Sequence, residues 1–136
     1  ALNLNWKDVD LNKETFKVFD TKNHRDHTLP MTDNTKLMFE RRFNEGNKFV
    51  FTSPIHNSKP MTASKTFQRV SKEVGFDFTA HDLRRTVATV ASERGYDISS
   101  IGAVLNHSKQ GVTEGYIQRT IPRLKQILVD IESELF

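Results

Sequence analysis

The 136-residue sequence contains no cysteine, which excludes disulfide bonds, zinc–thiolate sites and a cysteine nucleophile. This absence suits a reducing cytoplasm, where we expect the protein to reside. No uncharged apolar run approaches the ~18 residues of a membrane span, and the first ten residues lack the basic-then-apolar order of a signal peptide. We therefore expect a protein without a membrane-spanning segment.

The sequence also lacks several motifs that mark common enzyme classes. It has neither G-x-x-x-x-G-K-[ST] nor G-x-G-x-x-G, which cradle phosphates in nucleotide-binding folds, and it has no G-x-S-x-G nucleophile motif. Its carboxylates are scattered, and His24 and His27 lie in a polar turn without a carboxylate pair at metal-ligand spacing. We therefore expect neither a metal ion nor another cofactor.

The composition is that of an ordinary globular protein, with 36% hydrophobic and 27% charged residues. The length favours one domain with one compact core. The net charge of +3 comes from residues 1–68, where 11 basic side chains face 8 acidic ones. This balance is compatible with a phosphate-rich partner and does not by itself require one.

The first third of the chain predicts a small antiparallel sheet. Residues 15–19 are rich in β-branched and aromatic side chains, as strands are. A second strand is expected at 27–29, and Pro30 ends it. The polar stretch 21–26 between them has the length of a hairpin turn, which places Lys22 and Arg25 at or near the tip.

The rest of the chain predicts helices, so the expected fold class is α+β, mainly helical, with the sheet near the N-terminus. A short buried strand at 49–51 and a loop at 52–60 interrupt this pattern. We expect six helices. The first begins near Thr32 or Asp33, and the second begins near Thr62 and ends at Gly75. The third carries Leu83 to Ala91 and ends at Gly95, the fourth is capped by Asp97, the fifth spans 112–117, and the last begins at Pro122.

His81 and Arg84 are three residues apart at the start of a predicted helix, so both project from one face while Leu83 and Val87 pack underneath. A guanidinium presents a fork of donors that matches phosphate oxygens, and an imidazole can donate or move a proton. The pair is suited to binding an oxyanion. A solvated helix start without chemistry has the same spacing.

His107 and Tyr116 are nine residues apart, which places them on opposite faces of one continuous helix. They can share a site only if the helix breaks between them, and the polar run 109–111 ending in glycine predicts such a break. Taken singly, each also fits a structural role, the tyrosine in packing and the histidine at a helix end.

Three motifs taken together resemble the tyrosine recombinases, the phage integrase family. They are HDLRRT at 81–86, LNH at 105–107 and TEGY at 113–116, in the order and spacing found in that family. LNLNWKDVD at 2–10 and TKNHRDHTLPM at 21–31 are similar to further segments of its catalytic domain. The resemblance covers nearly the whole chain.

The resemblance implies site-specific cleavage and rejoining of double-stranded DNA through a 3′-phosphotyrosyl intermediate, in the integration or excision of a phage or mobile element. The implied catalytic residues are Tyr116 as nucleophile, Lys22 on the hairpin, and His81, Arg84 and His107 around the scissile phosphate. The implied DNA contacts are Lys22, Arg25, Arg84 and Arg85. The implied setting is a bacterial or phage-encoded homotetramer on attachment sites, aided by DNA-bending proteins.

Two features depart from the family pattern. Asn106 replaces the glycine that usually precedes the last histidine, but asparagine tolerates positive φ. The family's first catalytic arginine would precede residue 1, so we expect 1–136 to be a truncated catalytic domain, inactive alone, with its N-terminal DNA-binding domain upstream. The resemblance also favours docking of the last helix on a neighbouring protomer, although packing in cis has the same sequence pattern.

Three alternatives stay open at this point. A type IB topoisomerase has a similar site but reseals the same strand. A catalytically inactive relative would use the fold only to hold DNA. A helix-turn-helix regulator would need one helix dense in base-reading polar residues, and no predicted helix is of this kind.

Overall fold

The computed structural model describes residues 2–19, 26–43, 46–56, 58–106 and 120–136. The chain divides into two compact units, Ala1–Ala80 and His81–Phe136, which we call the N-terminal and C-terminal units and describe separately. The described buried side chains form two clusters, one in each unit, rather than the single core that the length favours. That the chain acts as one domain stays a prediction.

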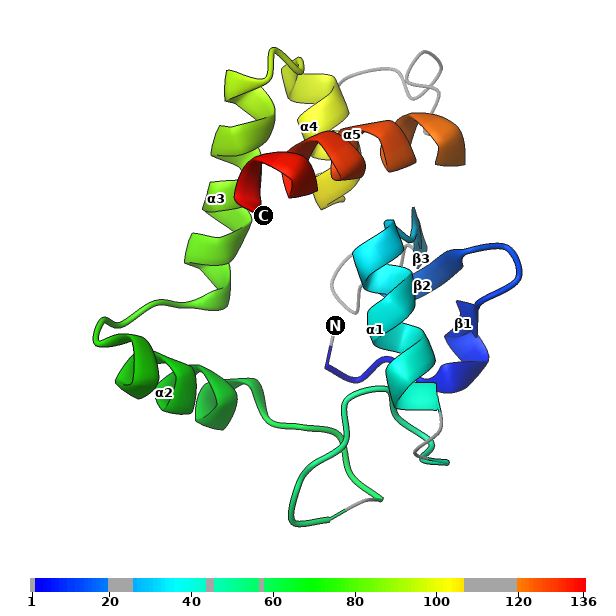
Figure 1. The fold of residues 1–136 in the computed structure, drawn as a ribbon, viewed down its shortest axis with the longest axis vertical. Coiled ribbons are helices and arrows are strands. Elements are labelled where there is room, and N and C mark those ends of the chain that lie inside the picture. The colour runs from blue at the N-terminus through cyan, green and yellow to red at the C-terminus, as the bar shows by residue number, and fades with distance from the viewer. Residues whose placement is uncertain (1, 20–25, 44–45, 57, 107–119) are drawn as a thin grey trace. The chain divides into compact units, whose positions relative to one another are not determined.

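A three-stranded antiparallel sheet with the order β1-β2-β3 forms the start of the N-terminal unit (Figure 1). A single 3-10 turn, η1 (Trp6–Asp8), leads into β1 (Val9–Asp10), followed by β2 (Thr15–Phe19) and β3 (Asp26–Pro30). The register pairs Val9 with Phe16 and Val18 with His27. The two predicted strands are confirmed, and the sheet ends at Pro30 as expected.

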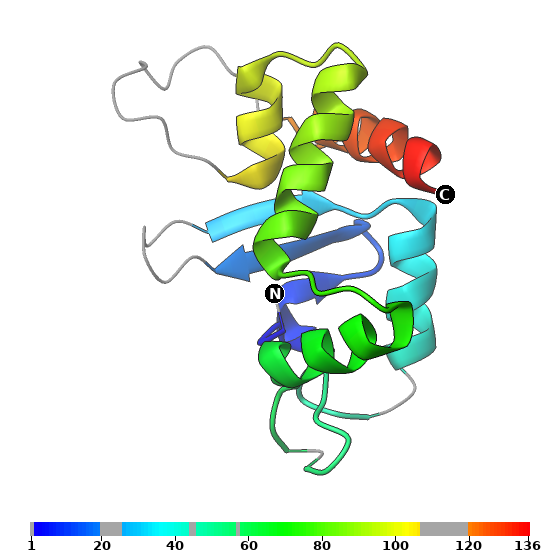
Figure 2. The same ribbon diagram turned by 90° about the vertical axis from the view of Figure 1, so that its left-hand side faces the viewer.

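Helix α1 (Asp33–Phe43) follows the sheet and supplies the centre of the first cluster. Phe39 is 2% exposed, and the rings of Trp6 and Phe16 meet its ring edge-on, with centroids 6.2 and 5.3 Å away. Figure 2 shows α1 lying alongside the strands. The aromatic contacts fix the sheet against α1, because edge-to-face ring pairs add to the stabilisation from burial.

The predicted strand at 49–51 is wrong. This segment makes only an isolated bridge between Asn5 and Phe49. Val50 is nevertheless 1% exposed, and its N–H donates to the carbonyl of Leu4 at 2.9 Å. The short apolar run reflects burial without a strand partner, which a sequence pattern cannot distinguish from a strand. The predicted loop at 52–60 is confirmed, apart from one bridge between its ends.

Helix α2 (Ala63–Val74) completes the N-terminal unit and confirms the prediction of a helix after Thr62. It ends at Gly75, which has φ 81°, the left-handed conformation that glycine adopts without strain. Phe67 packs edge-on against Phe78 beyond the helix end, with ring centroids 5.4 Å apart.

The C-terminal unit consists, over its described residues, of α3 (Ala80–Glu93), α4 (Ile98–Leu105) and α5 (Ile121–Leu135). Asp97 caps α4 by accepting a hydrogen bond from the Ser100 N–H at 2.7 Å, as predicted. Pro122 lies in the first turn of α5, also as predicted. The predicted helix at 112–117 lies outside the described residues.

The second cluster joins all three helices of this unit. Its buried side chains are Val90 and Ala91 of α3, Ala103 and Val104 of α4, and Leu124, Ile127 and Ile131 of α5. Helix α5 therefore packs on α3 and α4 of its own chain, and docking of this helix on a neighbouring protomer stays a prediction. The α+β fold class with its N-terminal antiparallel sheet is confirmed.

One detail of the α3 prediction needs correction. Val87 packs against the second cluster as expected, whereas Leu83 is 50% exposed. The cluster contacts α3 only from Val87 onward, because the first turns of α3 extend past the side chains that α4 and α5 contribute. Among the described helices, none is long and apolar enough to cross a membrane.

Candidate active site

His81 and Arg84 lie in the first turns of α3, one helical turn apart, and so share a face as the sequence predicted. His81 is exposed and Arg84 is half-buried. Arg85 is exposed on a neighbouring face, where its guanidinium lies 3.9 Å from the carboxylate of Asp82. Such a surface ion pair contributes little stability, so Arg85 can exchange this partner for a phosphate at small cost.

The guanidinium of Arg84 donates a hydrogen bond from Nη2 to the carbonyl oxygen of Leu105. This contact ties the start of α3 to the last turn of α4, where the carbonyls carry a partial negative charge. Asn106 follows in the left-handed conformation with φ 52° and ψ 38°, and its N–H donates to the Gly102 carbonyl. The predicted turn at Asn106 is confirmed, and the next residue in the sequence is His107.

The structure thus joins two of the three family motifs: the arginine of HDLRRT contacts the first residue of LNH. Lys22, Arg25, His107 and Tyr116 lie outside the described residues. Their roles stay predictions. Among the described residues, no group of three or more histidine, aspartate or glutamate side chains could hold a metal ion.

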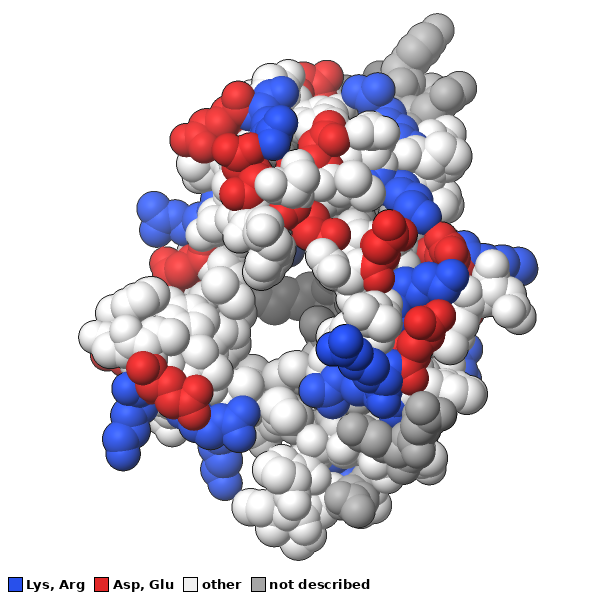
Figure 3. All heavy atoms as spheres, viewed as in Figure 1, with Lys and Arg blue, Asp and Glu red and all other residues white. Residues whose placement is uncertain are grey.

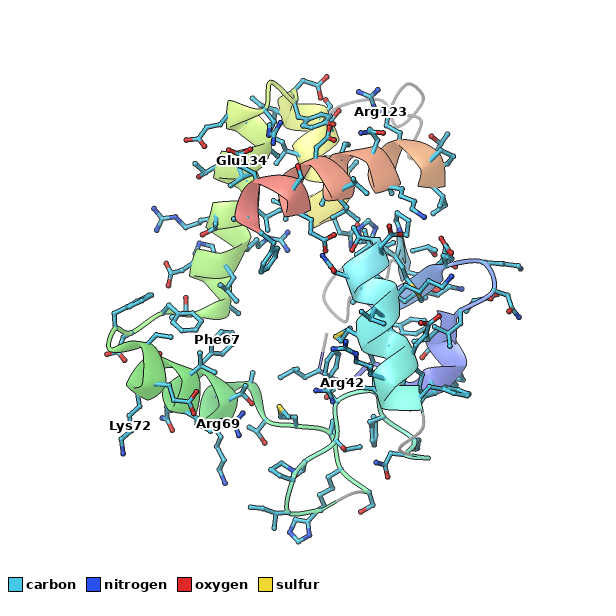
Figure 4. The ribbon with its side chains drawn as sticks, in the orientation of Figure 1. Arg42, Phe67, Arg69, Lys72, Arg123 and Glu134 are labelled. Atoms are coloured by element: carbon cyan, nitrogen blue, oxygen red, sulfur yellow. The ribbon has the colours of Figure 1, made fainter. Side chains whose placement is uncertain are left out.

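Helix α2 carries a cationic face that the sequence analysis missed. Lys65, Arg69 and Lys72 are spaced i, i+4, i+7 and therefore line up along one side of the helix. Figure 3 shows Lys and Arg side chains projecting from this part of the surface, and Figure 4 shows Arg69 and Lys72 pointing away from Phe67. The signal for this face is a helical period of positive charge, which is separate from the apolar period that predicts the helix.

A cavity of about 360 Å³ lies beside the start of α2. Its cationic lining residues are Lys59, Lys65 and Arg69, and no acidic side chain is among the described residues that line it. Hydroxyl groups of Ser53 and Thr62 line it as well. Ammonium, guanidinium and hydroxyl groups are the side-chain donors that contact DNA phosphates, so this part of the N-terminal unit can bind a polyanionic backbone.

Polar bonds tie the α3–α4 connection to α5 in the C-terminal unit. The Tyr96 hydroxyl donates to the carboxylate of Asp130, and this hydrogen bond is the main cause that raises the pKa of Tyr96 and lowers the pKa of Asp130. The guanidinium of Arg94 pairs with the Glu134 carboxylate. These contacts orient α5 beyond what its apolar stripe alone would specify.

Comparison with known proteins shows the family of the chain. The profile of the phage integrase family matches residues 1–121. The chain is 30% identical over 119 residues to tyrosine recombinase XerA of Saccharolobus solfataricus, covering 88% of this chain and 40% of that protein. It is 30% identical over 123 residues to prophage integrase IntA of Escherichia coli, covering 85% and 30% respectively.

Tyrosine recombinase XerA of Pyrococcus furiosus is also 30% identical, over 133 residues, with 91% of this chain and 46% of that protein covered. The chain spans less than half the length of these curated relatives. Since the family profile matches most of the chain, the protein belongs to the phage integrase family of tyrosine recombinases.

Proposed function

We propose that the protein is a site-specific DNA recombinase that cleaves and rejoins DNA through a 3′-phosphotyrosyl intermediate, in the integration or excision of a phage or mobile element. The observation that carries the proposal is the contact between the Arg84 guanidinium and Leu105, because it joins the histidine–arginine motif of α3 to the chain that continues into His107. A phosphate bound by Arg84 would lie close to the residues that directly precede His107 in the sequence.

Tyr116 is the proposed nucleophile. The phenol of a tyrosine in a model peptide has a pKa of about 10, so its ionisation at neutral pH costs about 4 kcal/mol unless a base takes the proton during attack. His81 is the proposed base, since it is exposed on the same helix face as Arg84. The phenolic oxygen bonds to phosphorus as the 5′-oxygen leaves, and the 5′-hydroxyl of another strand later reverses the step.

Arg84 neutralises the non-bridging oxygens on which charge grows, and His107 donates a further hydrogen bond to them. Lys22 gives its proton to the departing 5′-oxygen. The bond energy is kept in the phosphotyrosine, so strand exchange requires neither ATP nor a metal ion. Double-stranded DNA is the proposed partner, held as a tetrameric complex at its attachment sites.

The test is covalent capture. The full-length protein is incubated with a pool of nicked duplexes of random sequence, in which the loss of a short strand after cleavage prevents religation. Adducts are recovered on denaturing gels. We expect an adduct from the wild type, and sequencing of the captured DNA identifies the site.

Tyr116→Phe is expected to form no adduct. Tyr96→Phe is the matched control, because Tyr96 is the only other tyrosine in the sequence and its hydroxyl is bonded to Asp130. It should still form the adduct. If Tyr116→Phe forms the adduct as well as Tyr96→Phe does, the proposed nucleophile is wrong.

The cationic face of α2 is proposed to hold the DNA backbone. Log affinity falls as log salt rises, and replacing Lys65, Arg69 and Lys72 together by glutamine should make this slope shallower by about 3, roughly one for each lost phosphate contact. Lys13→Gln on the β1–β2 turn, an 81% exposed side chain, is the control. An unchanged slope in the triple variant would contradict this placement of the DNA.

A further inference from the structure

Arg123 links the first turn of α5 to the buried start of α4. Its guanidinium donates from Nη2 to the hydroxyl of Ser100 at 3.0 Å. Ser100 is 3% exposed, and its N–H donates to the carboxylate of Asp97, the cap of α4, at 2.7 Å. Arg123 is therefore the exposed end of a polar chain that runs into the helix packing of this unit.

The packing of α5 does not depend on this link. Leu124, Ile127 and Ile131 are all at most 4% exposed, and they hold the helix on α3 and α4. The farther half of the helix has its own polar ties, at Asp130 and Glu134. Figure 4 shows Arg123 and Glu134 at opposite ends of α5. The bond from Arg123 to Ser100 is a polar tie at the first turn.

The position of that turn in the sequence gives the link its significance. Arg123 lies seven residues after Tyr116, and at the other end of α4 the Arg84 guanidinium bonds to Leu105, two residues before His107. The segment that carries His107 and Tyr116 therefore follows the end of α4, which Arg84 contacts, and precedes the start of α5, which contains Arg123. Fixing both ends of a chain segment restricts the positions that its residues can sample.

We infer that Arg123 is a positioning residue for DNA cleavage. By bonding to Ser100 it fixes the start of α5, which is the point where the segment that carries Tyr116 ends. This inference rests on the proposed function. It assigns Arg123 no contact with DNA. Attack on phosphorus depends steeply on alignment, so loss of the anchor acts on the rate of the covalent step and leaves DNA affinity unchanged.

The experiment measures two quantities in the complete protein, using a nicked duplex of the captured sequence. One is the rate of adduct formation at saturating DNA, and the other is the dissociation constant for the intact duplex. In Arg123→Met we expect the rate to fall about tenfold or more while the dissociation constant stays within about twofold. Ser100→Ala removes the acceptor and should slow the reaction similarly.

The double variant Arg123→Met/Ser100→Ala should be no slower than the slower single variant, because the two changes break one link. Arg94→Met is the matched control, since it removes an arginine tie to α5 at the opposite end, on Glu134. It should leave the rate within about twofold even if it lowers the melting temperature as much as Arg123→Met does.

The outcomes separate the two proposals. No adduct from the wild type would overturn the proposed function and this inference with it. An adduct from the wild type with an unchanged rate in Arg123→Met would overturn this inference alone. Equal slowing in Arg94→Met and Arg123→Met would also overturn it, since Arg123 would then act only through the stability of the unit. A weakened dissociation constant with an unchanged rate would make Arg123 a DNA contact instead.

Discussion

Substitution of Asn106 tests the turn that leads from α4 toward His107. Asn106 has φ 52° and ψ 38°, a left-handed conformation in which Cβ of an ordinary residue crowds the backbone at a cost of about 1–2 kcal/mol. Asparagine and glycine tolerate it, and β-branched residues tolerate it least. The strain in a variant at this position therefore follows from the shape of the new side chain.

We expect Asn106→Ala to lower the free energy of unfolding by about 1 kcal/mol and Asn106→Val by about 2 kcal/mol. Asn106→Gly should stay within about 0.5 kcal/mol of the wild type, because relief of strain offsets the greater flexibility that glycine gives the unfolded chain. The bond from the residue-106 N–H to the Gly102 carbonyl is made by the backbone and is available in every variant.

Urea unfolding followed by far-UV circular dichroism measures these differences, with the slope of the transition checked for constancy. Adduct formation should decline in the same order, from glycine and asparagine to alanine to valine, because the turn directs the chain toward His107. Equal stability in the alanine and valine variants would show that residue 106 is not left-handed and would contradict this prediction. A loss in the glycine variant as large as in the alanine variant would refute it too.

Three further predictions concern the core, the pH response and the leaving group. Ile127→Ala should lower the free energy of unfolding by about 2–5 kcal/mol in urea titrations, since Ile127 is 1% exposed in the second cluster, and a loss below 1 kcal/mol would contradict that packing. The hydrogen bond from Tyr96 lowers the pKa of Asp130, so the stability that this bond contributes should be present above the unfolded pKa of about 3.9 and disappear as the pH falls through the lower folded value. When unfolding is measured across pH 2–6, Asp130→Asn should lose less stability in acid than the wild type does. An identical loss of stability would contradict the bond. Sulfur in place of the bridging 5′-oxygen should restore cleavage to Lys22→Ala but not to Arg84→Ala, because a thiolate leaves without a proton; failure of the rescue would make Lys22 a phosphate contact.

The sequence predicted those elements whose signals are local. Gly75 and Asp97 mark helix ends through backbone freedom and a side-chain cap, and the structure has them in those roles. The predicted strand at 49–51 is wrong because Val50 is buried in the first cluster, with its N–H bonded to the Leu4 carbonyl, without belonging to a strand ladder. Periodicity reports burial, and burial alone does not specify a strand.

The site was predictable to the extent that its motifs are contiguous. HDLRRT fixes the spacing of His81 and Arg84 within one helix, so their shared face follows from helical geometry. The contact from Arg84 to Leu105 and the link from Arg123 to Ser100 join residues about twenty positions apart in the sequence. Such pairs depend on how α3, α4 and α5 pack, and no local pattern encodes them.

The central claim, that this chain forms a phosphotyrosyl bond through Tyr116, is tested most directly by mapping the DNA-linked residue. The captured adduct is digested with nuclease and trypsin, and the modified peptide is sequenced by mass spectrometry. We expect a nucleotide 3′-phosphate on the tyrosine of the peptide that contains Tyr116. A nucleotide attached to Tyr96, to a serine, or through its 5′-phosphate would contradict it.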